Sequence, residues 1–445
     1  MIMSRTIAKA VIVAAALLLA SFAAGAQAYS GYAPYSIFGI GDTFTQGTAY
    51  NRSMGGVGIA TRNNRFINPL NPAAVTARDS LAFMADYSVY GENKIFRQGD
   101  MTSANNAFNI GDLIMSFPIY GPSAMMVGIM PYSTTGYGYS FYYDDPSVIG
   151  NTGNINYAAG GRGSIYKLFA DVGVTLWDRL SLGVEADYYF GNIVKEYAET
   201  FSNSSYNSMS NGFNMQLTAF GVKAGVQYEQ KLGSKAKLTL GATYSLDSDI
   251  DGYVEGYKYS AGEAATDTLY HKIDTLSSNP GRVKLAGELG VGINFKYADK
   301  FSAEFNYTRS DWTDCGFASV QGFACNTVSR SGVSAFGTTC SEAYRLGVEY
   351  VPNRNDIRYY FKRVTYRAGA YYKKDYYTVD GKGITSAGLT FGMTLPVFRW
   401  YNGLTLGVEL CQRGSINDNL IRERYFNFTV GMNIFDIWFQ HPKYE

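Results

Sequence analysis

Apolar and polar residues alternate along most of this chain from about Leu81 onward. In the stretch Leu180–Tyr188, alternate positions carry Leu, Leu, Val, Ala and Tyr, and the positions between them carry Ser, Gly, Glu and Asp. The stretch Leu238–Leu246 repeats the pattern, with Thr, Gly, Thr and Ser between the apolar residues. Because successive side chains of a β-strand point to opposite faces, this period of two predicts strands with one apolar and one polar face.

Fourteen strands of this kind are expected. They are Leu81–Tyr90, Phe108–Phe117, Ala124–Tyr132, Gly163–Leu176, Leu180–Val194, Phe213–Gln230, Ala236–Leu246, Arg282–Tyr297, Phe301–Trp312, Glu342–Val351, Lys362–Lys373, Gly383–Leu395, Leu404–Arg413 and Ile421–Phe435. The last of these, with Phe426, Phe428, Val430, Met432 and Ile434 on one face, is expected to pair with the first and close the sheet.

The expected links between these strands alternate between short and long. Tight turns are expected at 120–122, 177–179, 232–235, 298–300, 353–356 and 402–403, and long polar loops at 133–162, 247–281 and 311–341. Short links on one rim and long loops on the other are typical of an outer-membrane β-barrel. A β-sandwich would show the same alternation of residues, but it has no reason to sort its loops in this way.

The segment before the first strand has a different composition. It holds, in order, Gly55, Gly56, Gly58, Asn68, Pro69, Asn71, Pro72 and Ala73. Each proline lacks an N–H and displaces the residue before it from the helical region, so a sheet ladder cannot pass through. Asn71 is a good helix N-cap, with Pro72 at the first helical position. We therefore expect compact turns and short helices that form a small hatch, or plug, in the lumen of the barrel.

The first residues have the layout of a secretory signal peptide. Arg5 and Lys9 supply the charge, Ala10–Leu19 the apolar core, and Ala-Gln-Ala, ending at Ala28, the cleavage site. A transmembrane anchor is the alternative, but the apolar run is short for a span of about 20 residues. The expected division is therefore a signal peptide at 1–28, a hatch at 29–79, a transmembrane barrel at 80–439 and a periplasmic tail at 440–445.

Composition and charge agree with an exported barrel. The chain has 38 Tyr, 27 Phe and 49 Gly, and its formal net charge is +1. Aromatic girdles and tightly curved sheets call for such a composition. A near-neutral chain argues against a nucleic-acid partner, which would require a basic patch. Charged residues on the polar faces, such as Glu304, Arg345, Glu349 and Arg367, mix both signs. They either form a selectivity lining or a network that grips the hatch, or they pair with one another in a solvated lumen.

Candidate catalytic and metal-binding residues are sparse. The chain has two histidines, His271 and His441, and no Ser-His-Asp set can be assembled on the expected strands. Cys-x-x-Cys and His-Glu-x-x-His spacings are absent. We therefore expect neither an enzyme nor a bound metal or cofactor.

Three of the four cysteines, Cys315, Cys325 and Cys340, fall in one expected outer loop, and Cys411 lies near the outer end of a strand. In an exported protein, such cysteines are expected to form one or two disulfides that brace the loop. The spacing leaves their connectivity open.

The third strand differs from the others because Pro131, Tyr132, Gly136 and Gly138 interrupt it. Pro131 removes a ladder donor, and the two glycines favour a bulge or a bend. One interpretation is a bend in the barrel wall, and the other is a strand that ends there in an outer loop. The aromatic stretch Tyr137–Tyr143 is expected in that outer loop.

The residues Met54-Gly55-Gly56, followed by Asn71-Pro72-Ala73-Ala74 and then by a first strand, resemble the N-terminal hatch of the FadL/TodX family, in the form found in Bacteroidetes-type bacteria. Members of that family are outer-membrane transporters of hydrophobic compounds. The resemblance covers most of the mature chain, and it implies an all-β, 14-stranded antiparallel transmembrane barrel with a hatch in its lumen. It also implies an inward kink of the third strand at 131–138, which opens a lateral portal through the wall.

We therefore expect passive uptake of hydrophobic compounds, fatty-acid-like or aromatic, across the outer membrane of a diderm bacterium. The hatch residues Gly55, Gly56, Asn68, Pro69, Asn71, Pro72 and Ala73 would gate the lumen. Expected partners are the lipid bilayer and a hydrophobic small-molecule ligand, although the polar loop at 202–211 departs from the apolar capture loops of the family. The alternative is a non-transporting subunit or scaffold of an outer-membrane assembly or secretion complex, with an outer-membrane protein as partner. A general porin would instead need an unobstructed lumen.

Overall fold

The computed structural model describes most of the chain from Gly31 to Ile437. The described ranges are 31–79, 81–143, 146–150, 152–261, 269–276, 282–323, 327–329, 332–397, 403–417 and 420–437. The expected signal peptide, the first two residues of the expected hatch, and residues 438–445, which include the expected tail, lie outside these ranges.

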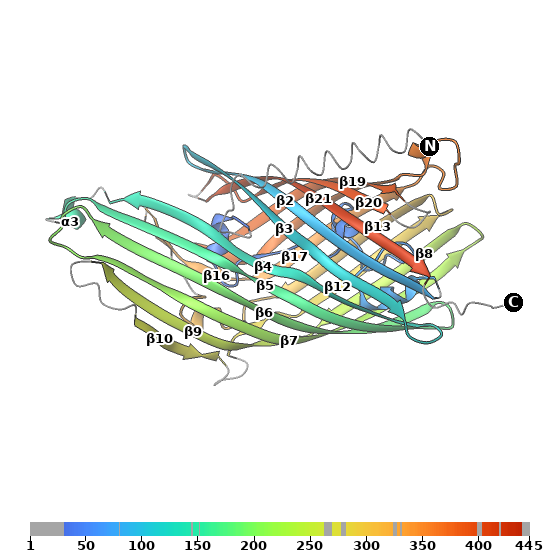
Figure 1. Ribbon diagram of the computed structural model, residues 1–445, viewed down its shortest axis with the longest axis horizontal. Helices are drawn as coiled ribbons and strands as arrows, with labels where there is room; N and C mark the ends of the chain where they lie inside the picture. Colours follow the sequence, from blue (N-terminus) through green and yellow to red (C-terminus); the bar gives the residue numbers. More distant parts are fainter. Residues whose placement is uncertain are drawn as a thin grey trace.

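The described chain forms a closed antiparallel barrel of fourteen strands (Figure 1). In order around the barrel, the strands are β2 (Ala82–Gln98), β3 (Met101–Pro118), β4 (Ser123–Tyr142), β5 (Ile155–Leu176), β6 (Leu180–Phe201), β7 (Ser208–Leu232), β8 (Ala236–Ser245), β12 (Glu288–Tyr297), β13 (Phe301–Asp311), β17 (Cys340–Tyr350), β18 (Thr365–Val379), β19 (Lys382–Pro396), β20 (Gly403–Arg413) and β21 (Arg422–Ile437). Strand β2 pairs with both β3 and β21. The predicted barrel, and its closure by the last strand, are therefore confirmed.

The barrel has polar side chains inside and apolar side chains outside. In β6, Glu185 is fully buried, whereas its neighbours on the other face, Leu182 and Val184, are 41% and 57% exposed. The outward faces of β8, β12, β19 and β21 show the same row of exposed apolar side chains. An apolar band of this kind is stable when lipid tails cover it. The period of two in the sequence therefore assigns each face correctly.

Helices contribute little to the described part of the chain. None of them there is both long enough and apolar enough to span a bilayer.

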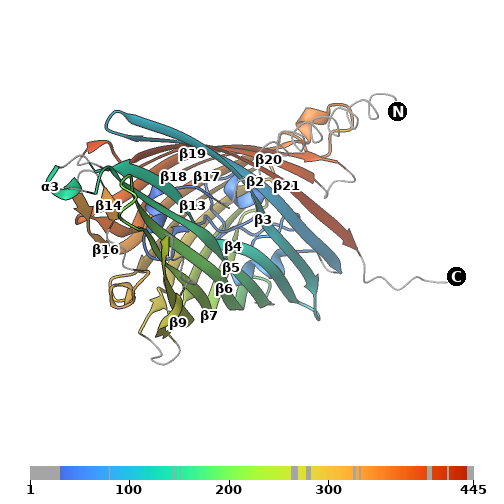
Figure 2. The ribbon, with the colours of Figure 1, turned by 60° about the vertical axis from the view of Figure 1, so that its left-hand side comes forward.

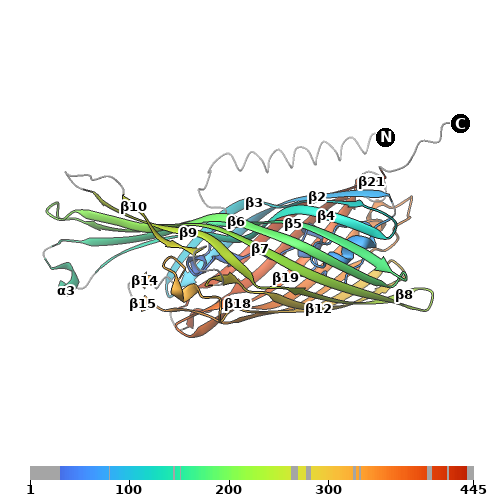
Figure 3. The same ribbon diagram turned by 90° about the horizontal axis from the view of Figure 1, so that it is seen from below.

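Several strands extend beyond their expected ends on the long-loop side. Strand β4 continues to Tyr142 and pairs there with the start of β5, so most of the loop expected at 133–162 is a strand pair. The loop expected at 247–281 contains β9 (Ser248–Ala261) and β10 (Leu269–Thr275), and β9 pairs with β7 beyond the end of β8. These two loop expectations are wrong in this respect. Figure 3 shows the extended strands projecting at the end of the barrel opposite the β7–β8 turn.

The loops between the barrel strands also contain short strands and helices. They are β11 (Lys284–Leu285), β14 (Thr327–Ser329), β15 (Gly332–Ser334), β16 (Phe336–Thr338), α3 (Pro146–Ile149), η4 (Phe317–Ser319) and η5 (Tyr360–Lys362).

Residues 31–79, called the N-terminal segment below, lie within the ring of strands (Figures 1 and 2). The segment contains η1 (Pro34–Ile37), β1 (Asp42–Thr43), α2 (Ala49–Arg52) and η2 (Pro72–Ala77). Element η2 packs against β5, β6 and β7, whereas α2 packs against β20 and β21 on another part of the wall. As expected, η2 begins at Pro72, and the Asn71 side chain accepts a hydrogen bond from the N–H of Ala73.

Candidate functional site

Inward-facing glycines bring the barrel wall into direct contact with the N-terminal segment. We call this set the glycine belt, and its members are Gly173 (β5), Gly183 (β6), Gly225 (β7), Gly241 (β8), Gly347 (β17), Gly369 (β18), Gly392 (β19) and Gly431 (β21). A Cβ at Gly183 would overlap the backbone of Pro72, and one at Gly369 would overlap the backbone of Gly55. Only glycine allows so close an approach. The belt therefore holds residues 49–75 on several sides at once.

The predicted hatch residues lie at the centre of this belt. All seven, Gly55, Gly56, Asn68, Pro69, Asn71, Pro72 and Ala73, are buried. Gly55 and Gly56 have φ values of +73° and +75°, which favour glycine. The N–H of Gly55 donates to Thr390 Oγ1 of β19 at 2.8 Å.

Three asparagine side chains form hydrogen bonds to the backbone of residues 57–59. The amide Nδ2 atoms of Asn51, Asn68 and Asn71 donate to the carbonyl oxygens of residues 57, 58 and 59, at 2.9, 2.6 and 2.8 Å respectively. Buried backbone carbonyls need such partners because water does not reach them. The Asn-Pro pairs thus contribute side-chain hydrogen bonds as well as turns.

Charged residues of the wall bind the segment further. Arg52 forms an ion pair with Asp112 of β3 at 2.7 Å, and Asp112 is fully buried. Glu304 of β13 accepts hydrogen bonds from the N–H of Ala60, at 2.9 Å, and from the hydroxyl of Thr61. Other wall residues pair with each other, as Lys167 of β5 does with Glu185 of β6 at 2.7 Å. The lumen charges therefore include some that grip the segment and some that pair within the wall.

Arg367 of β18 combines these two roles. It pairs with Glu349 of β17 at 3.0 Å, and its guanidinium lies 4.3 Å from the centre of the Tyr50 ring of the N-terminal segment. A cation over an aromatic face in a desolvated site is stabilising by about 2 kcal/mol.

Strands β3 and β4 pair with each other over only a short part of their lengths. Strand β3 pairs with β2 over nearly its full length, but it pairs with β4 only from Leu113 to Pro118. Beyond Ile129, this side of β4 pairs with β1 of the N-terminal segment, with Thr134 opposite Asp42. Figure 2 shows β3 and β4 diverging toward the long-loop end. The wall therefore has a break here, which we call the β3–β4 break.

The predicted portal residues lie on the part of β4 beside this break. A register shift between Pro131 and Ser133 marks a bulge at Tyr132, whose ring packs edge-on against Tyr189 with centroids 4.7 Å apart. Gly136 and Gly138 are paired with β5 on their other side. The interpretation in which the strand ends at this point is wrong, because β4 continues to Tyr142.

The start of the N-terminal segment stands in the β3–β4 break. The hydroxyl of Tyr32 donates to the carbonyl of Gly138 at 2.6 Å, and its ring packs against Phe96 of β2 with centroids 5.3 Å apart. The N–H of Ala33 donates to the carbonyl of Gly136 at 2.8 Å. A Cβ at Gly136 would overlap the carbonyl oxygen of Gly31. Residues 31–44 thus lie beside the part of β4 that does not pair with β3.

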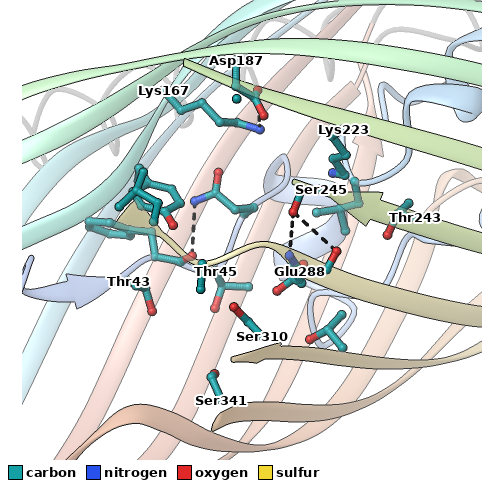
Figure 4. Close-up of a pocket in the computed structure, with 18 of the residues that line it drawn as sticks. Thr43, Thr45, Lys167, Asp187, Lys223, Thr243, Ser245, Glu288, Ser310 and Ser341 are labelled. Carbon is teal, nitrogen blue, oxygen red and sulfur yellow. Dashed lines mark hydrogen bonds and ion pairs between the residues drawn. The ribbon is translucent and has the colours of Figure 1, made fainter. Parts of the chain in front are cut away.

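A cavity of about 170 Å³ lies between residues 43–46 and the wall (Figure 4). Aromatic and charged side chains line it together. Figure 4 shows Lys167 and Asp187 facing each other, and these residues form an ion pair at 3.2 Å. A second cavity of about 120 Å³, on another side of the same residues, is lined by Glu92 and Arg413 among others. The lumen that remains open therefore presents both polar and apolar surface.

An aromatic cluster fills the lumen toward the long-loop end. Its rings belong to Tyr35, Phe38, Tyr137, Trp312, Phe317, Phe323, Tyr376 and Tyr377. The amine of Lys195, fully buried, donates to the carbonyls of Ile37 and Gly322 at 2.7 and 2.6 Å. The expectation that Tyr137 lies in an outer loop is wrong, since its side chain is buried in this cluster. Tyr137, Phe317 and Phe323 lie in ranges expected as outer loops, and Tyr35 and Phe38 lie in the expected hatch, so no local pattern in the sequence unites them.

The cysteines do not pair in the described structure. Cys315, Cys340 and Cys411 are free thiols, so the predicted disulfide is not formed between Cys315 and Cys340. Cys325 lies outside the described residues. Burial raises the pKa of the Cys315 thiol to about 12, which keeps it protonated at neutral pH. In the described residues, no group of three or more His, Cys, Asp or Glu side chains is placed to hold a metal ion.

Known structures with a similar architecture were found for this chain. No curated protein matches the chain. Solved structures that match include the CymD monoaromatic hydrocarbon channel (11% identity, TM-score 0.57, covering 87% of this chain and 97% of that chain) and the Ralstonia pickettii toluene transporter TbuX (13%, 0.54, 87% and 97%). A Pseudomonas aeruginosa FadL homologue also matches (12%, 0.55, 89% and 99%).

The first of these neighbours is named as a channel and the second as a transporter. At these identities the likeness shows the fold. A barrel of this kind implies the bacterial outer membrane. The BamG family model matches residues 6–445. The chain therefore has the FadL/TodX-type barrel fold and belongs to the BamG family.

Proposed function

We propose that this protein is an outer-membrane channel through which small hydrophobic compounds, fatty-acid-like or aromatic, pass without an energy source. They leave the lumen sideways through the β3–β4 break. The observation that carries the proposal is the loss of β3–β4 pairing beyond Leu113 and Ile129, where the N-terminal segment takes the place of a barrel strand. The names of the structural neighbours, which include a toluene transporter and a monoaromatic hydrocarbon channel, support the ligand class.

The hatch residues would seal the straight path to the periplasm. The glycine belt presses the wall onto Gly55 and Pro72, which leaves no room for a solute to pass between them. A hydrophobic molecule in the lumen would instead gain from moving sideways into lipid, since burial of apolar surface is favourable by about 25 cal/mol per Å². Pro131, Tyr132, Gly136 and Gly138 would form the portal, and residues 31–44 would be its movable closure.

A reversible tether tests this route. Thr43 and Ser133 face each other across the β1–β4 pairing, so the double variant T43C/S133C, made with the native cysteines replaced by serine, can form a disulfide. Oxidation should abolish the flux of toluene into proteoliposomes, and a reductant should restore it. The single variants T43C and S133C serve as controls. Equal flux in the oxidised and reduced double variant would refute a movable closure, and wild-type flux no greater than that of empty liposomes would refute transport.

A second function, that of a non-transporting subunit or scaffold of an outer-membrane complex, is favoured by different observations. The glycine belt fixes the core of the N-terminal segment, and ion pairs such as Lys167–Asp187 line the cavity beside residues 43–46. Desolvating such charges against an apolar ligand is costly. Co-purification with a stoichiometric outer-membrane protein in mild detergent, together with absence of toluene flux, would establish this function instead.

A further inference from the structure

The link between β17 and β18 is a long loop on the rim where other links are tight turns. It covers residues 351–364, whereas three residues each join β5 to β6, β7 to β8 and β12 to β13. The tight turn expected at 353–356 is therefore only one part of a larger loop. Figure 1 shows this loop in orange at the right-hand end of the barrel, the end with the β7–β8 turn.

The loop is both basic and apolar at its surface. It contains Arg354, Arg358, Lys362 and Arg363 against a single acidic residue, Asp356. Ile357 is 92% exposed and Phe361 is 74% exposed. Apolar side chains rarely stand so far out of a folded surface unless another phase or molecule covers them.

Two of the basic side chains gather around one ring. The guanidinium of Arg358 lies 5.3 Å from the centre of the Tyr359 ring, and the amine of Lys362 lies 4.5 Å from it. The carboxylate of Asp356 accepts hydrogen bonds from the N–H groups of Arg358 and Tyr359, at 2.9 and 2.6 Å. These contacts give the loop a defined shape, so its cations and apolar tips keep fixed relative positions.

The loop rests on the outer side of the wall. Arg367 contacts Ser53 inside the barrel, so its neighbour in the strand, Tyr366, points outward. The hydroxyl of Tyr366 donates to the carbonyl of Phe361 at 3.1 Å, and the hydroxyl of Tyr360 donates to the carbonyl of Pro396 at the end of β19 at 3.0 Å. Residues 359–361 therefore lie where the apolar band of the barrel meets the aqueous rim.

We propose that the loop 351–364 binds the phosphate groups of anionic phospholipids in the adjacent leaflet. Ile357 and Phe361 enter the acyl boundary, and Arg358 and Lys362 contact the phosphates. Long basic side chains place their charges at headgroups while their stems stay in lipid, and aromatic residues collect at the same depth. The position against the lipid-facing wall favours phospholipid over an acidic protein, which would not require apolar tips beside the band.

Lipid titration of the detergent-purified full-length protein tests this proposal, with native mass spectrometry to count bound molecules. The probes are short-chain phosphatidylglycerol and phosphatidylcholine, and we expect stronger binding of phosphatidylglycerol. The variant R358Q/K362Q should bind phosphatidylglycerol about thirtyfold more weakly, at about 1 kcal/mol for each basic residue near an anionic surface. The matched control is R179Q/K300Q, which removes two exposed charges from tight turns on the same rim.

The outcomes separate the alternatives. Equal binding of the two lipids, or equal loss in R358Q/K362Q and R179Q/K300Q, would overturn the proposal. Retention of an acidic protein by the wild type but not by R358Q/K362Q, without a preference for phosphatidylglycerol, would reassign the loop to a protein partner. A second variant, I357S/F361S, should weaken the binding of both lipids. The heat-modifiable mobility of folded barrels on a denaturing gel would confirm that each variant folds. The test does not depend on transport.

Discussion

The core of the N-terminal segment and its first residues are held in the barrel in different ways. Residues 49–75 meet the wall through the glycine belt, backbone against side chain or backbone, on several sides. Residues 31–44 pair with β4 through a two-residue ladder and a few further hydrogen bonds. Their backbone touches the wall directly at Gly31 and Gly41, and side chains supply most of their other contacts. Where backbone packs directly on backbone, no side chain can rotate to make room. Where side chains make the contact, a change of rotamer can make room. The first residues have the smaller share of direct backbone contact, so they are the part of the segment that we propose as the movable closure.

The largest expected effect concerns the ion pair of the segment core. The variant R52M leaves Asp112 buried without its partner, and breaking such a pair typically costs about 3–5 kcal/mol. Denaturant unfolding in detergent should show a loss of this size. The double variant R52M/D112N should recover much of it, because no buried charge is then left unpaired. If R52M unfolds like the wild type, Arg52 does not hold the core.

A somewhat smaller loss is expected in the glycine belt. The variant G173A places a Cβ 2.7 Å from a side-chain carbon of Val75, and overpacking of this kind typically costs about 1–3 kcal/mol. The control G160A lies in the same strand, but its Cβ meets only one atom, at an ordinary 3.7 Å. Equal unfolding free energies for the two variants would show that the belt does not grip the segment.

The first residues should respond in flux more than in stability. The variant Y32A removes the ring that packs against Phe96 and the hydroxyl that donates to Gly138. We expect toluene flux to rise while the free energy of unfolding falls by only about 1 kcal/mol, the usual value of one hydrogen bond. The control Y120A removes a tyrosine that is 86% exposed in the β3–β4 turn. Unchanged flux in Y32A would place the closure elsewhere.

The smallest effect is a chemical one, at Cys315. Its buried, protonated thiol should react slowly with iodoacetamide at pH 7.5. Since the hydroxyl of Tyr376 donates to the carbonyl of Gly41 at 2.8 Å and its ring packs against Trp312, Y376A should loosen the cluster and speed alkylation several-fold. The half-buried Cys340 provides an internal reference. Fast alkylation of Cys315 in the wild type would contradict a closed cluster over residues 31–44.

The sequence predicts the membrane part of the wall well because lipid imposes a strict alternation there. The strand Leu180–Phe201 shows where this signal ends, since Leu182 and Val184 face lipid but the outer residues of the strand no longer alternate clearly. The expected strand therefore stopped at Val194. The same loss of signal concealed β9 and β10.

The belt and the pairing of β1 with β4 escaped prediction for another reason. The alternation places Gly183 and Gly241 on a polar face, but their role depends on lying level with Pro72 and Ile59 along the axis of the folded barrel. The spacing of residues in the sequence does not reveal where each glycine lies along the barrel axis relative to the N-terminal segment. Pro131 and Gly136 indicated a bend in β4, whereas the pairing of Thr134 with Asp42 links residues 92 positions apart and leaves no local pattern.

The close fit at the belt restricts the order in which the molecule can be put together. A completed cylinder has no gap at Gly183 or Gly369 wide enough for a folded insert to slide past. The pairing between β2 and β21 must consequently form last, after the core of the N-terminal segment has taken its position. Whatever inserts this chain into its membrane has to keep the sheet open until residues 49–75 are surrounded by the strands.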